Sequence, residues 1–339
     1  MKSIVFFGIL LFFLLCNSRA YCADFSALKG INLDQSLESA SKWKVSPTQD
    51  ELNLIKALGF NAIRLPIAIS NHLDGSGQRI SEAYLSRLKG VVSDARSLGF
   101  FVIVDLHDKE IAKSIGNHSS DLLVGIWKQI AIKLGGVKDG VAFEILNEPF
   151  SASTPQKWSS IQNSVVDEIR KIDPNRPLIL TGSKWGEIES LAKIVPSSHK
   201  KNIYYTIHYY SPMWFTHQGA NWIKDSDRNI GRAWVSNKDN LHRLASDFAE
   251  VANWGKANDY SLILGEFGVI DKVPELDRAE WAYSVRVEAE ARNVGWFYWS
   301  FKGDFGIIDI KKACLRRVLV RALTGVDKQP PVGYIYCDR

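Results

Sequence analysis

The sequence has few cysteines, no long apolar run after its start and no cluster of basic residues. Its four cysteines show no Cys/His spacing of the kind that binds zinc. The formal charge of +5 is spread along the 339 residues, which argues against a nucleic-acid partner. No linker, repeat or low-complexity tract divides the chain after residue 23, so we expect one domain over residues 24–339.

The start of the chain, residues 1–23, has the pattern of a secretory signal peptide. Lys2 precedes an apolar run from Ile4 to Leu15, and small residues follow where a signal peptidase would cut. The run is too short to span a bilayer. We therefore expect cleavage after Ala20 or Ala23. The product would be a secreted protein, extracellular or periplasmic, that acts as a monomer without membrane attachment.

Two cysteines, Cys314 and Cys337, remain near the C-terminus. Cys16 would leave with the signal peptide, and Cys22 would leave too if cleavage follows Ala23. An oxidising compartment would permit Cys314 and Cys337 to form a disulfide. Two free thiols are the alternative.

Short apolar runs alternate with amphipathic stretches along the chain. Eight strand–helix units of this kind predict an α/β fold, a (β/α)₈ TIM barrel. A doubly wound open sheet is the alternative, but no glycine-rich phosphate loop follows the first strand. The first helix is predicted to have Ser46 as its N-cap and Pro47 in its first turn. We predict strands over residues 28–33, 61–66, 101–106, 141–146, 178–181, 203–207, 261–265 and 296–301, and helices over 47–58, 81–98, 121–134, 155–172, 187–194, 241–254, 277–292 and 313–323.

Polar residues stand at the carboxyl ends of these predicted strands, where TIM-barrel enzymes have their active sites. Taken singly, each has a structural explanation: the arginine could form an ion pair, and the histidines could be hydrogen-bonded core residues. Packing alone explains poorly why they occur at one strand end after another. The residues are Arg64, Asp105, His107, Asn147, Glu148, His208, Tyr210, Glu266 and Trp299.

In these residues the sequence resembles glycoside hydrolase family 5. Members of that family carry, in chain order, arginine, histidine, Asn-Glu, His-x-Tyr, glutamate and tryptophan at the ends of strands 2, 3, 4, 6, 7 and 8. The segment 143–149, Phe-Glu-Ile-Leu-Asn-Glu-Pro, is similar to the endoglucanase branch of the family. The resemblance extends from about Gly30 to Leu323.

The resemblance implies a retaining endo-β-1,4-glucanase that cuts a β-glucan polysaccharide and uses no metal or cofactor. Glu266 would attack the anomeric carbon of the sugar. Glu148 would protonate the departing oxygen and then deprotonate the incoming water. Retention requires the two carboxyl groups to lie about 5 to 5.5 Å apart, which is a prediction for the structure.

Roles for the neighbouring residues follow from the same resemblance. Arg64 and Tyr210 would hydrogen-bond Glu266, and Asn147 would hold the 2-hydroxyl of the sugar. Trp185 could be a sugar platform or a packing residue. Further sugar contacts are implied for His107 and His208, which would bind hydroxyls or position the acid, for Trp299 as the floor under the sugar, for His217 and Trp222 in the cleft, and for Asn32 and Glu38 as hydroxyl-binding residues.

Three alternatives stay open. The same scaffold could carry a β-mannanase, a xyloglucanase or an exopolysaccharide hydrolase. A non-catalytic glycan-binding protein could have kept the cleft. A metal-dependent hydrolase would leave the two glutamates unexplained, and its ligands would be Asp105, His107, Asp108 and His208.

Overall fold

The computed structural model describes residues 24–115, 120–151 and 154–337 and folds them around a closed barrel of eight parallel strands. The strands follow one another around the barrel in chain order, and β8 pairs with β1 to close it. The predicted (β/α)₈ architecture is confirmed. The strands are β1 (Lys29–Asn32), β2 (Ala62–Ile67), β3 (Phe101–Leu106), β4 (Val141–Glu144), β5 (Leu178–Thr181), β6 (Ile203–Tyr209), β7 (Ser261–Phe267) and β8 (Gly295–Tyr298).

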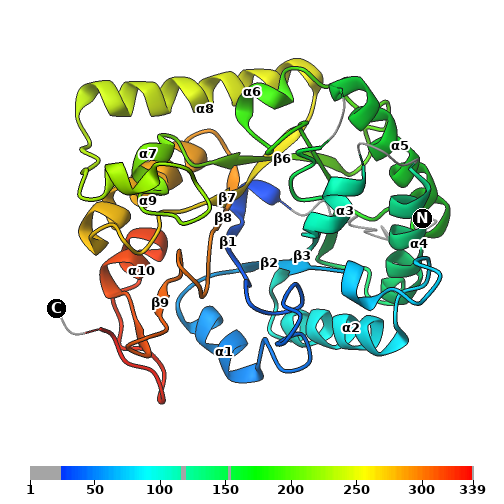
Figure 1. The fold of residues 1–339 in the computed structure, drawn as a ribbon, viewed down its shortest axis with the longest axis horizontal. Coiled ribbons are helices and arrows are strands. Elements are labelled where there is room, and N and C mark those ends of the chain that lie inside the picture. Colours follow the sequence, from blue (N-terminus) through cyan, green and yellow to red (C-terminus); the bar gives the residue numbers. More distant parts are fainter. Residues whose placement is uncertain (1–23, 116–119, 152–153, 338–339) are drawn as a thin grey trace, which may run out of the picture.

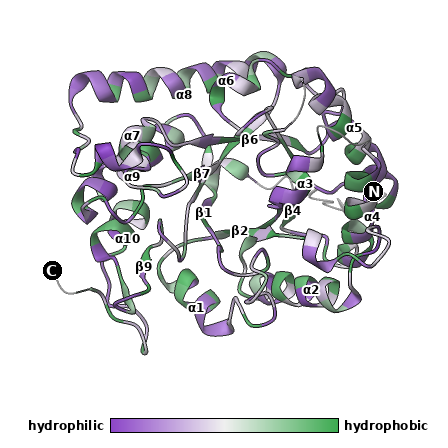
Figure 2. Ribbon diagram, viewed as in Figure 1, coloured by the Kyte–Doolittle hydropathy of each residue, from purple (hydrophilic) through white to green (hydrophobic). Residues whose placement is uncertain are grey.

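Helices surround the barrel, with α2, α4, α5 and α8 at its periphery (Figure 1). Most carry hydrophobic and hydrophilic residues in alternation along the ribbon, because one face packs on the strands and the other meets solvent (Figure 2). None of the helices in the described part of the chain is both long and apolar enough to cross a membrane. The helices are α1 (Gln49–Ala57), α2 (Glu82–Ser97), α3 (Lys109–Ser114), α4 (Asp121–Leu134), α5 (Pro155–Ile172), α6 (Ile188–Leu191), α7 (Met213–Thr216), α8 (Lys238–Asn258), α9 (Glu275–Glu290) and α10 (Arg317–Thr324).

The barrel strands separate two apolar clusters, because successive side chains point to opposite faces of a strand. On β3, Val102 and Val104 belong to the large cluster between strands and helices, whereas Ile103 belongs to the smaller cluster inside the barrel. The short 3₁₀ helix η1 (Phe25–Ala27) closes the amino end of the barrel. Its Phe25 ring stacks on Tyr204 with the ring centroids 3.7 Å apart. The carboxyl end of the barrel is thereby left as the polar end.

The first helix begins differently from the prediction. Thr48, not Ser46, is its N-cap: the Thr48 hydroxyl accepts from the backbone N–H of Glu51, and the Glu51 carboxylate accepts from that of Thr48. These two hydrogen bonds satisfy backbone N–H groups that have no acceptor within the helix. The helix therefore starts at Gln49, and Pro47 lies outside it.

The last helix is also shorter than predicted, because residues 313–315 are not helical. Cys314–Leu315 forms strand β10, which pairs with β9 (Ile308–Asp309) in a small antiparallel sheet. Cys314 forms a disulfide with Cys337, so the first of the two alternatives for these cysteines holds. The backbone N–H of Cys337 also donates to the carbonyl of Leu315, which fixes the C-terminal segment on this sheet. The predicted signal peptide, residues 1–23, lies outside the described residues.

Candidate active site

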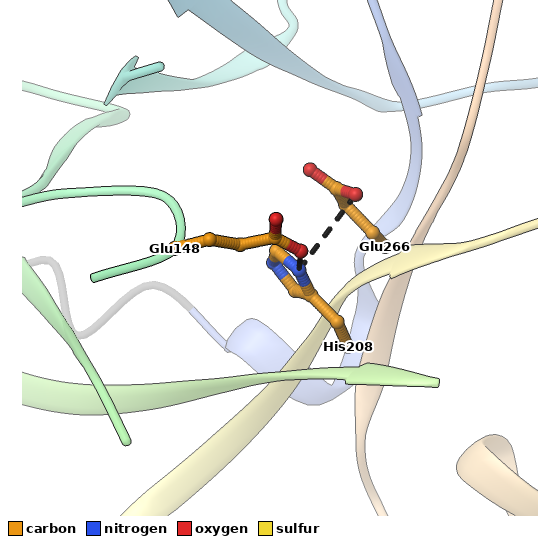
Figure 3. A group of neighbouring side chains, drawn as sticks. All are labelled: Glu148, His208 and Glu266. Atoms are coloured by element: carbon orange, nitrogen blue, oxygen red, sulfur yellow. Dashed lines mark hydrogen bonds and ion pairs between the residues drawn. The ribbon is translucent and has the colours of Figure 1, made fainter. Parts of the chain in front are cut away.

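Two glutamates meet at the carboxyl end of the barrel. Glu266 lies in β7, and Glu148 follows β4 after the chain has left the strand. Figure 3 shows both carboxylates beside the ring of His208, which comes from β6. The Nδ1 atom of His208 lies 2.9 Å from a Glu148 oxygen and 3.7 Å from a Glu266 oxygen. These ligand-type atoms of the three residues all lie within 4.8 Å of one another.

The separation of the two carboxylates decides which chemistry they can perform on a glycosidic bond. Enzymes in which a water attacks need about 6.5 to 9.5 Å between the carboxyl groups, to leave room for that water. One oxygen of Glu148 lies within 4.8 Å of one oxygen of Glu266, which is close to the separation of about 5 to 5.5 Å of enzymes that retain configuration. This distance suits direct attack by one carboxylate while the other transfers a proton.

The two glutamates differ in their surroundings. The side chain of Glu148 is 23% exposed, whereas that of Glu266 is 6% exposed and is bonded on both oxygens. Arg64 donates to one oxygen of Glu266 at 2.8 Å, and the Tyr210 hydroxyl donates to the other at 2.9 Å. Burial would raise the pKa of Glu266, but attraction to His208 and Arg64 outweighs burial and lowers the pKa to about 2. Glu266 is therefore ionised at neutral pH.

Arg64 connects the site to the barrel interior and has no exposed surface. Its guanidinium donates twice to Glu144, with both distances 2.8 Å, and lies 3.0 Å from Asp105. It also donates to the side-chain oxygen of Asn147 at 2.7 Å. Glu144 was missed in the sequence, although strand alternation could have found it: Ala142 points into the barrel, so the residue two positions later does too.

His107 and Asn147 form a second contact between strand ends. The side-chain nitrogen of Asn147 lies 3.2 Å from Nε2 of His107, and Nδ1 of His107 lies 3.1 Å from the Asp105 carboxylate. Burial would lower the pKa of His107, but the hydrogen bond and attraction to Asp105 outweigh burial and raise the pKa to about 9. The ring is therefore charged at neutral pH, and Nδ1 donates to Asp105. The His107 ring stacks on Trp299, with centroids 5.3 Å apart. Nδ1 of His107 also lies 3.9 Å from a Glu266 oxygen, so His107 links Trp299 to the carboxylate site.

A cavity of about 640 Å³ extends from Glu148 and His208 over the ends of β5 and β6. The predicted cleft residues His217 and Trp222 line it, together with Tyr210. Trp185 lines it as well, is 50% exposed and stacks on Phe150 with centroids 4.8 Å apart. Its indole is thus available on one face and supported on the other, which favours the platform over the packing interpretation.

Asn32 is not a hydroxyl-binding residue, and that prediction is wrong. Its side chain is fully buried, because Asn32 is the last residue of β1 and points into the barrel beside Arg64. Its amide nitrogen donates to the carbonyls of Gly265, Phe297 and Tyr298, and its oxygen accepts from Arg64. Asn32 therefore joins β1 to β7 and β8 beneath the site.

Glu38 has a structural contact that its predicted role did not include. One oxygen accepts from the backbone N–H of Gln35 and the other from that of Ser36 at 3.0 Å. Burial raises the pKa of its carboxyl group. Glu38 thus shapes the loop after β1, and its half-buried side chain is close enough to His107 to be attracted by it.

The four ligands of the metal-dependent alternative are not brought together. The Asp108 carboxylate is the N-cap of α3 and also accepts from the backbone N–H groups of Ile69 and Ser70. Asp105 is an ion-pair partner of Arg64. Within residues 24–115, 120–151 and 154–337, the group of potential ligand atoms that does converge is Glu148, His208 and Glu266.

The family model of cellulases, glycosyl hydrolase family 5, matches residues 19–304 of this chain. The chain belongs to this family. The resemblance seen in the sequence is thereby confirmed, and the protein is a glycoside hydrolase whose family implies a β-glycan substrate.

Named relatives are distant. Endoglucanase H of Acetivibrio thermocellus is 27% identical over 292 residues, which cover 85% of this chain but only 31% of that protein. A structure of Cel5A from Thermotoga maritima in complex with mannotriose is 31% identical, with a TM-score of 0.83 and coverage of 88% of this chain and 98% of that chain. The cellulose synthase subunit Z of Clostridioides difficile is 30% identical, with a TM-score of 0.81 and coverage of 87% and 99%.

Proposed function

We propose that this family 5 hydrolase is a secreted, retaining endo-β-1,4-glucanase. The observation that carries the proposal is the pairing of a buried, ionised Glu266 with a more exposed Glu148 within 4.8 Å, at the mouth of one barrel. Relatives named endoglucanases support the substrate class. The pattern of residues 1–23 supports secretion, and we propose a monomer.

In the first step, a Glu266 oxygen forms a bond to the anomeric carbon while the bond from that carbon to the glycosidic oxygen breaks. Glu148 gives its proton to the departing oxygen, which leaves as the hydroxyl of the shortened chain. The sugar is then held as an ester of Glu266. The hydrogen bonds from Arg64 and Tyr210 hold the attacking carboxylate in place without a rearrangement during the reaction.

In the second step, a water attacks the anomeric carbon from the side that the leaving group vacated. Glu148, now a carboxylate, takes a proton from that water, and the ester bond to Glu266 breaks. Two displacements at one carbon restore its original configuration. Asn147, bonded to Arg64 and His107, presents its amide at the strand end where a sugar 2-hydroxyl would contact it.

The test compares hydrolysis of carboxymethyl-cellulose, glucomannan and xyloglucan by the parent chain, Glu148→Gln and Glu266→Gln. We expect the parent to cut carboxymethyl-cellulose, and both variants to lose activity by about 10⁴-fold or more. Glu110→Gln changes an exposed glutamate of α3 and is the matched control. A parent that is inactive on carboxymethyl-cellulose would contradict the substrate, and an active Glu266→Gln would contradict the mechanism.

A β-mannanase is the second candidate, favoured by the relative whose structure contains mannotriose. Faster cleavage of mannan than of glucan in the same assay would replace the first proposal by this one. Activity on neither polymer, with cleavage of a secreted bacterial cellulose, would point instead to an exopolysaccharide hydrolase, for which the cellulose synthase subunit is the relevant relative.

A further inference from the structure

The carboxylate pair and His208 form a cluster of three metal-ligand atoms that opens to the cavity (Figure 3). Nδ1 of His208 stands between the two carboxylates, 2.9 Å from Glu148 and 3.7 Å from Glu266. His208 and Glu266 come from β6 and β7, so the barrel holds these two donors in place, whereas Glu148 comes from the segment that follows β4. Donors on rigid strands need little rearrangement when an ion binds.

The spacing of the donors suits a small tetrahedral ion. Zinc binds histidine nitrogen and carboxylate oxygen at about 2.0 to 2.2 Å, which in a tetrahedron places neighbouring ligands about 3.3 to 3.6 Å apart. The two nitrogen–oxygen distances, 2.9 and 3.7 Å, lie on either side of this range. The two carboxylate oxygens lie within 4.8 Å of each other, so they approach by up to about 1.5 Å when both bind the ion. A water from the cavity would complete the coordination.

The far side of the His208 ring has an acceptor nearby but makes no hydrogen bond. Its Nε2 atom is buried and has no hydrogen-bond partner among the described residues, and the same is true of the hydroxyl of Thr206. Both atoms face the bare Cα of Gly265, where a Cβ would collide with Thr206 and lie 3.5 Å from Nε2. Metal-binding histidines usually donate their second ring N–H to an acceptor. Binding of an ion at Nδ1 would therefore require a small movement that brings the Nε2–H of His208 to the Thr206 hydroxyl.

We propose that Glu148, His208 and Glu266 form an inhibitory site for a transition-metal ion of the zinc type. The inhibition rests on the proposed function, whereas the binding of the ion does not. One imidazole and two carboxylates suit zinc, nickel or copper, whereas calcium takes six to eight oxygen ligands. A bound ion occupies both carboxylates at once, so neither can attack the sugar or transfer a proton. A bound metal ion therefore inhibits this enzyme, whereas a metal-dependent hydrolase needs its ion for activity.

The first test measures binding without activity. The full chain, free of any histidine tag, is titrated with zinc chloride in a calorimeter, and with cobalt chloride while the visible absorption of tetrahedral Co²⁺ is recorded. We expect one ion per chain, and an affinity that is lower by about tenfold or more in Glu148→Gln. Glu148 is the suitable position because Arg64 does not bond it, so its replacement leaves the buried ion pairs intact.

The control is His199→Ala, which removes a surface histidine paired with Asp167 at 2.8 Å. This variant is expected to bind zinc as the parent does. Equal zinc affinity in the parent and in Glu148→Gln, or loss of the bound ion in His199→Ala, would overturn the proposal. So would the absence of stoichiometric binding.

The second test measures hydrolysis of a soluble β-glucan with added zinc, and then with excess chelator. We expect inhibition by zinc that is competitive with substrate and reversed by the chelator, and no effect of magnesium or calcium. Activation by zinc would overturn the inference. A chain that binds zinc as predicted but cuts no β-glycan under any condition would refute the proposed function and leave the binding site standing.

Discussion

The two ends of the barrel interior are equally buried but opposite in chemistry. At the amino end, Phe25, Tyr204 and Phe297 fill the space with apolar rings. At the carboxyl end, Arg64 and Glu144 fill it with charge. Apolar filling stabilises the fold in proportion to the area it buries, whereas a buried ion pair contributes little net stability. The role of the buried charges is therefore to hold the carboxylate of Glu266 in place, and not to stabilise the fold.

The largest expected effect is on the reaction, at the charged end. Glu266→Ala should lower kcat by about 10⁴-fold or more, because no group remains to form the bond to the sugar. Added sodium azide should restore part of the rate with an activated aryl glucoside, since the small anion fits where the carboxylate was. The sugar azide formed should have inverted anomeric configuration, which nuclear magnetic resonance of the product shows. Rescue with retained configuration would contradict the assignment of Glu266 as nucleophile.

A second effect should appear in stability at the same end. Arg64→Met leaves Glu144 and Asp105 buried without their cation, so the free energy of unfolding should fall by about 3 to 5 kcal/mol. Glu266 loses a hydrogen bond as well, so kcat should fall with it. Denaturant unfolding measures the change in free energy of unfolding, and initial rates measure the change in kcat. A variant as stable as the parent would show that the carboxylates take up protons at little cost.

The amino end should respond in stability alone. Phe25→Ala opens a cavity under Tyr204 and Phe101, which should lower the free energy of unfolding by about 3 to 5 kcal/mol. The kcat of the molecules that stay folded should not change, because Phe25 lies at the opposite end of the barrel from Glu148 and Glu266. A tenfold loss of kcat in a folded Phe25→Ala protein would break the contrast between the two ends.

The disulfide should have a smaller effect, again without a change in kcat. Cys314 and Cys337 are 23 residues apart, and a loop of this length adds about 3 kcal/mol by restricting the unfolded chain. Cys337→Ser should lower Tm, and the parent under reducing conditions should match it. If reduction leaves Tm unchanged, the C-terminal segment is held by Tyr334 and Tyr336, which pack on the core, and not by the bond.

The sequence was sufficient for those side chains whose position follows from their location at the end of a strand. Apolar runs predicted the eight strands, and three of the polar residues at their ends, Glu148, His208 and Tyr210, line one cavity, with Glu266 hydrogen-bonded to Tyr210. The prediction failed for Asn32, which was predicted to bind a sugar hydroxyl. Alternation along β1 from Gly30, which faces the Phe297 ring, turns the Asn32 side chain inward. The same alternation would have revealed Glu144.

The start of α1 was ambiguous in the sequence, because two candidate N-cap residues, Ser46 and Thr48, lie two positions apart. Ser46 with Gln49 and Thr48 with Glu51 both fit the N-cap spacing, and only the contacts of the folded loop favour Thr48. The strand at Cys314 depends on pairing with a distant segment, which no periodicity in residues 313–323 could indicate. The reciprocal contacts of Thr48 and Glu51 decided the first boundary, and pairing of β10 with β9 decided the second.

The smallest expected effect concerns Asp34, a buried carboxyl on the loop after β1 that the reaction does not use. Burial raises its pKa to about 8, against the opposing hydrogen bond from the backbone N–H of Lys302 at 2.8 Å. Between about pH 4 and 8 the folded chain keeps a proton that the unfolded chain, with a pKa of about 3.9, has released. The free energy of unfolding therefore falls as pH rises through this window and levels off above it.

Asp34→Asn removes this dependence, because the amide is neutral at every pH and its oxygen can accept the same hydrogen bond. The difference in Tm between the variant and the parent should therefore grow by a few degrees as pH rises from 5 to 9. The conversion is about 2 °C or more in Tm for each kcal/mol of free energy of unfolding. Asp139→Asn, at an exposed turn, should follow the parent. Parallel Tm curves for parent and Asp34→Asn would mean that Asp34 is ionised in the folded chain. The carboxyl end of the barrel would then hold a further buried charge on the loop after β1, which would widen its contrast with the apolar amino end.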